Sequence, residues 1–198
     1  MSGVESEINI TVENSQEVCK TVKRSLNITK VGTPKSAWQY IMSRLPVIEY
    51  VQNTSLNYQK EVEKTNYRLY DSTEYQNSVK IIVHNIEQGL QWRDIGDSYA
   101  KERFNELQKS IPKRFSSHYS CKYISHSEPQ IGFILLTYKD GTKEVLFNWD
   151  FRDTLSDPTV LLSQDDEIFN MFSAQFNGLW ECAVESYDNS ITKSTSEK

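Results

Sequence analysis

The residues of this chain best suited to chemistry are one histidine and a few charged or amide side chains. Each borders a segment that is predicted to be a β-strand. An imidazole can act as a nucleophile or a general base, a guanidinium can bind an anionic group, and carboxylates and amides can supply hydrogen bonds. The candidate ligand-binding residues are Arg93, Asp94, His126, Glu128, Asn148 and Asp150.

Metal chemistry has weaker support in the sequence. His126 and Glu128 could supply two ligands, which is fewer than a zinc site needs. Asp150, Asp153 and Asp157 form an acidic cluster, but a solvated loop is the favoured interpretation. The chain also contains no glycine-rich phosphate loop of the known patterns. We therefore predict no metal site and no cofactor.

Charge and composition limit the classes of partner. The chain of 198 residues has a net charge of −5, with a basic middle over residues 20–122 and an acidic part over residues 123–198. The favoured interpretation is that these two parts neutralise each other across the folded surface. Nucleic acid is not favoured as a partner, because no cluster of Lys and Arg is interleaved with aromatic residues.

Membrane insertion and secretion are not expected. No apolar run approaches the roughly 18 residues that a membrane span needs, and the first residues lack a basic and an apolar signal region. We expect a cytoplasmic protein. We also expect a flexible segment over residues 1–14, one domain over residues 15–187 and a disordered tail over residues 188–198.

Hydrophobic periodicity predicts both strands and helices. Helices are expected over residues 15–26, over 38–45 until Pro46, after the capping residues 71–74, and after Asp97. Asp140–Gly141 is a strong hairpin signal. The expected strands are residues 28–34, 47–53, 90–95, 119–124, 131–138, 143–149 and 159–162.

Residues 163–166 are expected to cap the final helix, which has an acidic first turn at Asp165, Asp166 and Glu167 and carries a long apolar face. That face is more often core than interface. Its predicted members are Ile168, Met171, Phe172, Gln175, Phe176, Leu179, Trp180, Ala183, Val184 and Tyr187. The order of elements predicts an α/β fold, with a mixed sheet of about six to seven strands and helices packed on it.

Several segments resemble one half of the phospholipase D-like fold. They are the opening strand at residues 28–32, the helix end and strand at 87–93, the hairpin strand at 144–149 and the terminal helix at 171–180. The resemblance covers roughly residues 15–187. It implies a phospholipase D-like half-domain, and a protein with a single half must dimerise to complete a site, so a homodimer is one expectation.

The resemblance also implies a catalytic motif against which this chain can be compared. Active members carry His-x-Lys followed four residues later by Asp, with Gly-Ser-x-Asn on the next strand. The histidine attacks phosphorus and the lysine neutralises the phosphate. Matched at His126, the lysine position is Glu128 and the aspartate position is Phe133, while the Gly-Ser-x-Asn position reads Phe147 to Asp150. A carboxylate in place of the lysine reverses an interaction of about 4 kcal/mol at ~4 Å and an effective dielectric constant of ~20.

The sequence therefore favours a degenerate, non-catalytic phospholipase D-like domain that acts as a ligand-binding or regulatory and signalling module. Its partner would be a small molecule or a protein of unknown identity. Arg93 would bind an anionic group or pair with Glu128, or it would form a simple surface ion pair with Asp94. One alternative is a phosphodiesterase or nuclease with a rearranged site and His126 as its catalytic residue. Another is an oligomerisation or interaction protein that uses its final helix or a sheet edge.

Overall fold

The computed structural model describes residues 27–56, 73–125, 131–148 and 159–185. The predicted helix over residues 15–26 lies outside these ranges, as do both terminal segments and the predicted cap at Asp71. Among the described helices, none is long and apolar enough to cross a membrane.

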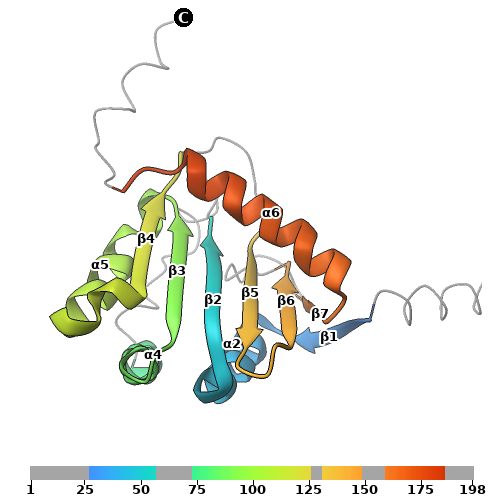
Figure 1. Ribbon diagram of the computed structural model, residues 1–198, viewed down its shortest axis with the longest axis horizontal. Coiled ribbons are helices and arrows are strands. Elements are labelled where there is room, and N and C mark those ends of the chain that lie inside the picture. The colour runs from blue at the N-terminus through green and yellow to red at the C-terminus, as the bar shows by residue number, and fades with distance from the viewer. Residues whose placement is uncertain (1–26, 57–72, 126–130, 149–158, 186–198) are drawn as a thin grey trace, which may run out of the picture.

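A single seven-stranded mixed sheet organises the described residues, which confirms the predicted fold class (Figure 1). Its strand order is β1-β7-β6-β5-β2-β3-β4, so β1 and β4 are the outer strands. β2, β3 and β4 are mutually parallel, whereas β5 runs antiparallel to both β2 and β6. The strands are β1 (Ile28–Gly32), β2 (Ile48–Ser55), β3 (Gln91–Gly96), β4 (Tyr119–Tyr123), β5 (Phe133–Tyr138), β6 (Lys143–Phe147) and β7 (Val160–Ser163).

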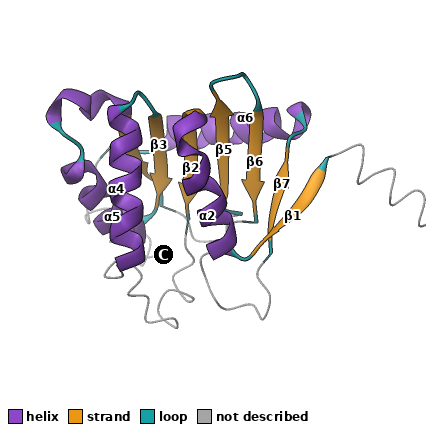
Figure 2. Ribbon diagram, turned by 90° about the horizontal axis from the view of Figure 1, so that it is seen from below, coloured by secondary structure: helices purple, strands orange, loops and turns teal. Residues whose placement is uncertain are grey.

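Helices cover both faces of the sheet. The helices α2 (Pro34–Arg44), α4 (Thr73–Glu87) and α5 (Lys101–Ser110) lie on one face, and α6 (Asp166–Cys182) lies on the other (Figures 1 and 2). Short 3-10 helices at Leu45–Val47, Ser98–Ala100 and Lys113–His118 join some of these elements. Parallel neighbours need a crossover of one fixed hand, so α4 and α5, which follow β2 and β3, share a face.

Local sequence explains where the helices begin. Thr33 caps α2 by accepting a hydrogen bond from the Ser36 N–H, with Pro34 in the first turn. Asp97, predicted to cap the helix that follows it, caps the short 3-10 helix Ser98–Ala100 that leads into α5: its side chain accepts from the N–H groups of Tyr99 and Ala100. Asp165 caps α6 in the same way. These side chains satisfy N–H groups that a helix leaves unpaired.

The hairpin predicted at Asp140–Gly141 connects β5 and β6. Gly141 has φ = 87°, a conformation that glycine adopts without strain. The Asp140 carboxylate accepts a hydrogen bond from the Thr142 N–H at 2.9 Å. This turn sets the register in which Leu135 faces Val145 and Phe133 faces Phe147.

The larger core lies beneath α2, α4 and α5. Ile41 and Leu45 from the first helix region and Ile86 from α4 are almost completely buried against Val51 and Ile134 of the sheet. A side chain of about this size stabilises the fold by roughly 1.5–3 kcal/mol when it is fully buried. This core holds the three helices to one face of the sheet.

The second core lies beneath α6 and corrects the predicted apolar face of that helix. Phe169, Phe172 and Phe176 are the buried residues, whereas Met171 is 59% exposed. The helix ends at Cys182, so Ala183 and Val184 lie beyond it, and Tyr187 lies outside the described residues. The predicted apolar face included Met171 and omitted Phe169. Helical spacing alone does not say which of two overlapping apolar faces packs on the sheet.

Most chain connections near the candidate residues lie at one end of the sheet, the end at which the parallel strands finish. Since β2, β3, β4 and β6 run in one direction and β5 and β7 in the other, Ser55, Gly96 and Tyr123 end strands at this end, and Phe133 and Val160 begin strands there. The helix α6 crosses the sheet close to the same end (Figure 1). Ligands of α/β proteins commonly bind at the carboxyl ends of parallel strands.

We expect Gly96→Ala to destabilise the protein by about 1–3 kcal/mol, the usual cost of overpacking a core. A Cβ atom at Gly96 would lie 2.5 Å from the Ala100 Cβ and 2.6 Å from a ring carbon of Phe104. The matched control is Gly178→Ala on α6, where a Cβ meets nothing within 4 Å and a helical alanine should stabilise by roughly 0.5–1 kcal/mol. Urea unfolding measures both. Equal midpoints for the wild type and Gly96→Ala would contradict the close packing of α5 on β3.

Candidate functional site

Among the candidates at the strand ends, the structure describes Asn148. It follows β6 with φ = 57°, a conformation that asparagine tolerates better than most residues. Its side-chain amide donates a hydrogen bond of 2.8 Å to the Thr159 carbonyl, which joins the end of β6 to the start of β7. Asn148 is therefore a turn residue with an exposed side chain. His126, Glu128 and Asp150 lie outside the described residues.

Arg93 and Asp94 lie on opposite faces of the sheet. Both belong to the middle of β3, where Arg93 pairs in register with Gln52 and Ser120. Because side chains alternate along a strand, Arg93 faces the side of α6 and Asp94 faces α5. The two candidate residues therefore cannot contribute to one ligand site on the same face of the sheet.

Asp94 is the centre of a buried polar cluster. It is 3% exposed, and both of its carboxylate oxygens accept hydrogen bonds from protein groups. The Asn53 amide donates at 2.6 Å and the Tyr119 hydroxyl at 2.8 Å. Such bonds offset the cost of removing a carboxylate from water. A ligand could reach this group only through a change in packing.

The neighbours of Asp94 respond to its charge. Burial, and then the Asp94 carboxylate, raise the pKa of the Tyr119 hydroxyl well above its ordinary value, so Tyr119 remains a hydrogen-bond donor at neutral pH. The Arg103 guanidinium, on α5, donates to the Ser55 hydroxyl at the end of β2. The Arg103–Ser55 contact holds α5 against the C-terminal ends of the parallel strands.

A second buried carboxylate, Glu144 of β6, has a similar structural environment. It accepts hydrogen bonds from the hydroxyls of Tyr40 and Tyr138 and from the amide of Gln164. Burial, and then this carboxylate, raise the pKa of Tyr40 to about 12. The cluster joins α2, the hairpin and the end of β7. Within the described ranges, no group of three potential metal ligands is close enough to hold an ion.

Arg93 belongs to an exposed cluster of cations and aromatic rings. Its guanidinium carbon lies 5.3 Å from the ring centroid of Trp180 and 5.5 Å from that of Tyr50. The Lys122 ammonium lies 5.0 Å from the same Trp180 ring and donates a hydrogen bond of 3.1 Å to the Trp180 carbonyl. Cation–π contacts of this kind contribute about 0.5–1 kcal/mol at exposed sites. They hold two positive charges beside one indole ring.

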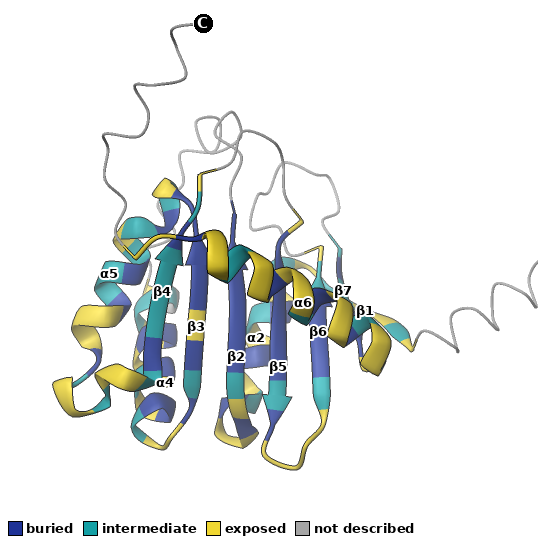
Figure 3. Ribbon diagram, turned by 45° about the horizontal axis from the view of Figure 1, so that its top comes forward, coloured by how far each residue is buried: buried dark blue, intermediate teal, exposed yellow. Residues whose placement is uncertain are grey.

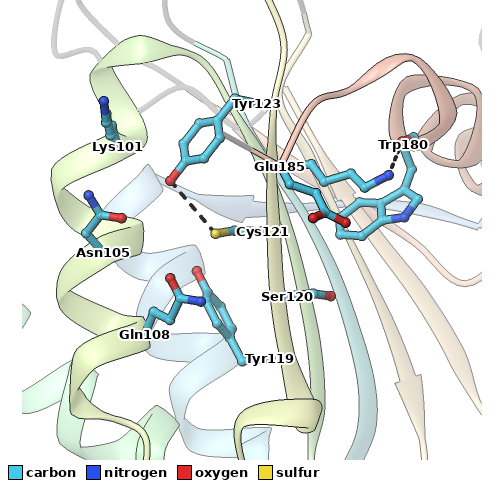
Figure 4. Close-up of a pocket in the computed structure, with 10 residues that line it drawn as sticks. Lys101, Asn105, Gln108, Tyr119, Ser120, Cys121, Tyr123, Trp180 and Glu185 are labelled. Atoms are coloured by element: carbon cyan, nitrogen blue, oxygen red, sulfur yellow. Dashed lines mark hydrogen bonds between the residues drawn. The ribbon is translucent and has the colours of Figure 1, made fainter. Parts of the chain in front are cut away.

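A pocket of about 400 Å³ extends along the free side of β4, next to this cluster (Figure 4). One wall is α5, which contributes Lys101, Asn105 and Gln108, and the other carries Trp180 and Glu185. The segment after α6 closes one end, because Tyr123 and Val184 exchange two backbone hydrogen bonds of 2.8 and 2.9 Å. The pocket therefore joins α5, β4 and the end of α6.

The sequence pointed to Arg93 but missed Lys122, Lys101 and the pocket. Alternation along residues 119–124 could have assigned Ser120 and Lys122 to one face of a strand. No local signal connects that strand with Trp180, which is 58 residues from Lys122 in the chain. Only the packing of α6 across the sheet brings these residues together.

Comparisons with known proteins identify the fold and no family. No protein-family model and no curated protein matches the chain. Among solved structures, TrmBL2, an archaeal chromatin protein with a novel mode of DNA binding, is similar with a TM-score of 0.54 and 12% identity. That likeness covers 92% of this chain and 66% of the TrmBL2 chain.

Two further structures have the same fold. Polyphosphate kinase from Porphyromonas gingivalis matches with a TM-score of 0.50 and 13% identity, over 78% of this chain and 26% of that chain. The phospholipase D family member Nuc from Salmonella typhimurium matches with a TM-score of 0.50 and 12% identity, over 81% of this chain and 98% of Nuc. At this identity the likenesses show a phospholipase D-like α/β fold and do not extend to activity.

We expect Tyr119→Phe to destabilise the protein by about 1–3 kcal/mol, because the change leaves one oxygen of the buried Asp94 carboxylate without its donor. The control is Tyr50→Phe, whose hydroxyl has no hydrogen-bond partner among the described residues and whose loss should change stability by less than about 0.5 kcal/mol. Chemical denaturation measures both. Equal losses for the two variants would show that the Asp94 cluster adds no specific stability.

Proposed function

We propose that this chain is a non-catalytic phospholipase D-like domain that acts as a ligand-binding or regulatory module. One observation carries the proposal. The strand pair that would hold the phosphodiester chemistry of this fold is filled by apolar side chains, and α6 lies on top of them. The support comes from the register of the hairpin β5–β6, from burial and from the packing of α6.

The hairpin offers a second place at which the expected catalytic motif can be matched to the chain. Counted back from Asp140 with the spacing His-x-Lys-x₄-Asp, the histidine and lysine positions fall on Phe133 and Leu135. Counted back from Asn148 with the pattern Gly-Ser-x-Asn, the glycine and serine positions fall on Val145 and Leu146. Both counts meet in one paired segment, since Leu135 faces Val145 across the two strands. The match at His126 and Glu128 stays open beside this one, because both residues lie outside the described part of the chain.

The buried, apolar environment of Phe133, Leu135 and Val145 disfavours the binding of a phosphate. Phe133, Leu135 and Val145 are at most 1% exposed. Their neighbours include Phe172 of α6, whose ring centroid lies 4.8 Å from that of Phe133. An ionised group entering this cluster would lose its hydration without gaining a charged partner. The nearest buried hydroxyls are those of Thr54, which is hydrogen-bonded to the backbone of Phe133, and Ser163, which pairs in register with Val145.

Two alternatives have less support. The interaction alternative relied on the apolar face of the final helix or on a sheet edge. Of that predicted face, Phe172 and Phe176 are buried on the sheet, whereas Met171 is 59% exposed. The enzyme alternative depends on His126, which lies outside the described residues, so no contact supports a catalytic role for it. Dimerisation, a cytoplasmic location and the exclusion of nucleic acid stay predictions.

The test is hydrolysis of bis-p-nitrophenyl phosphate in the presence of a chelator, with the wild type compared with His126→Ala. We expect no turnover above the uncatalysed rate from either protein, because the positions that would attack and neutralise the phosphate are apolar. An active phospholipase D-like nuclease assayed in parallel shows that the conditions detect catalysis. Turnover by the wild type that disappears in His126→Ala would overturn the proposal and establish the phosphodiesterase.

A further inference from the structure

We infer that the pocket along the free side of β4 binds a small phosphorylated molecule. This inference rests on the proposed binding function and names its site and its ligand class. The pocket has a volume of about 400 Å³, within the range of roughly 300–1,000 Å³ that small-molecule sites occupy. It lies at the outer strand of the sheet, away from the apolar cluster beneath α6.

The outer strand offers a backbone donor to a ligand. β4 is paired with β3 on one side, as the bond from the Ile124 N–H to the Gly96 carbonyl shows. The N–H and carbonyl of Tyr123 point to the other side, where they meet Val184. Because backbone groups alternate along a strand, those of Cys121 also point outward. No described residue forms a hydrogen bond with these outward-pointing backbone groups of Cys121. The Cys121 N–H is therefore available to an anion in the pocket.

Cations stand on both walls of the pocket. Lys122 comes from β4 and lies 5.0 Å from the Trp180 ring centroid. Lys101 comes from the first turn of α5, on the opposite wall from Trp180 (Figure 4). Arg93 adds a third positive charge behind the same indole ring. In the described part of the chain, no carboxylate forms an ion pair with Lys122 or Arg93. Charge-assisted hydrogen bonds from such groups are the strong ones in phosphate binding.

The remaining groups suit a ligand that also carries hydroxyls. The amides of Asn105 and Gln108 and the hydroxyl of Ser120 can each donate or accept. Glu185 is the one carboxylate among the residues that line the pocket, and it can accept from a ligand hydroxyl. Burial raises the pKa of the Cys121 thiol, so this group stays neutral at pH 7 and does not repel an anion. The chemistry therefore matches a phosphate ester rather than a hydrocarbon.

The first experiment is a binding titration by calorimetry, supported by thermal melting of the full chain. The probes are glucose 6-phosphate, adenosine 5′-monophosphate and inorganic phosphate, with glucose and adenosine as uncharged controls. We expect at least one of the two esters to bind and to raise the melting temperature, and the uncharged controls to do neither. Inorganic phosphate that binds as tightly as the esters would support the phosphate as the recognised group.

Charge-removing variants connect the binding to the pocket. Lys122→Gln and Lys101→Gln should each raise the dissociation constant about tenfold, since each removes one charged donor. The matched control is Lys143→Gln. Its ammonium also lies over an aromatic ring, 5.5 Å from the Phe169 centroid, but it does not line the pocket. Melting without ligand verifies that each variant is folded, and the control should bind like the wild type.

Three results would overturn the inference. One is the absence of binding by every phosphorylated probe, and another is equal affinity in the wild type, Lys122→Gln and Lys101→Gln. The third is binding of a single-stranded oligonucleotide that Lys122→Gln abolishes, when none of the small probes binds, because the surface would then serve nucleic acid. Hydrolysis of the diester substrate lost in His126→Ala would instead overturn the non-catalytic function, whatever the pocket binds.

Discussion

The packing of the α6 phenylalanines on the sheet is the contact on which the rest of this structure depends. Phe172 and Phe176 fill the space above Phe133, Leu135 and Val145, and this second core holds α6 to the face opposite the other helices. Burial on this scale stabilises a helix far more than its intrinsic propensity does.

The same helix decides which part of the sheet remains open. It crosses one end of the strands (Figure 3). Phe133 and Leu135 are buried, whereas Arg93 is exposed. Trp180, near the end of α6, supplies the ring beside which Arg93 and Lys122 are held. The order of strands then makes β4 an outer strand with one side unpaired by the sheet. Unpaired strand edges are surfaces to which other groups readily bind. The polar pocket lies along this edge of β4.

The differences between sequence and structure have specific causes. Arg93 and Asp94 are adjacent in the chain, and adjacency in a strand sends side chains to opposite faces. The expected face of the final helix included Met171 and omitted Phe169, since spacing alone offered two overlapping faces.

The sequence by itself determined the seven strands, the turn at Asp140–Gly141, the caps at Asp97 and Asp165, and hence a mixed sheet with helices packed on it. These features depend on alternation, turn residues and capping side chains that act within a few positions of the chain. Tertiary structure alone decided the strand order, the side of the sheet that α6 covers and the meeting of Arg93, Lys122 and Trp180. Those outcomes depend on contacts between residues tens of positions apart, which local periodicity does not encode.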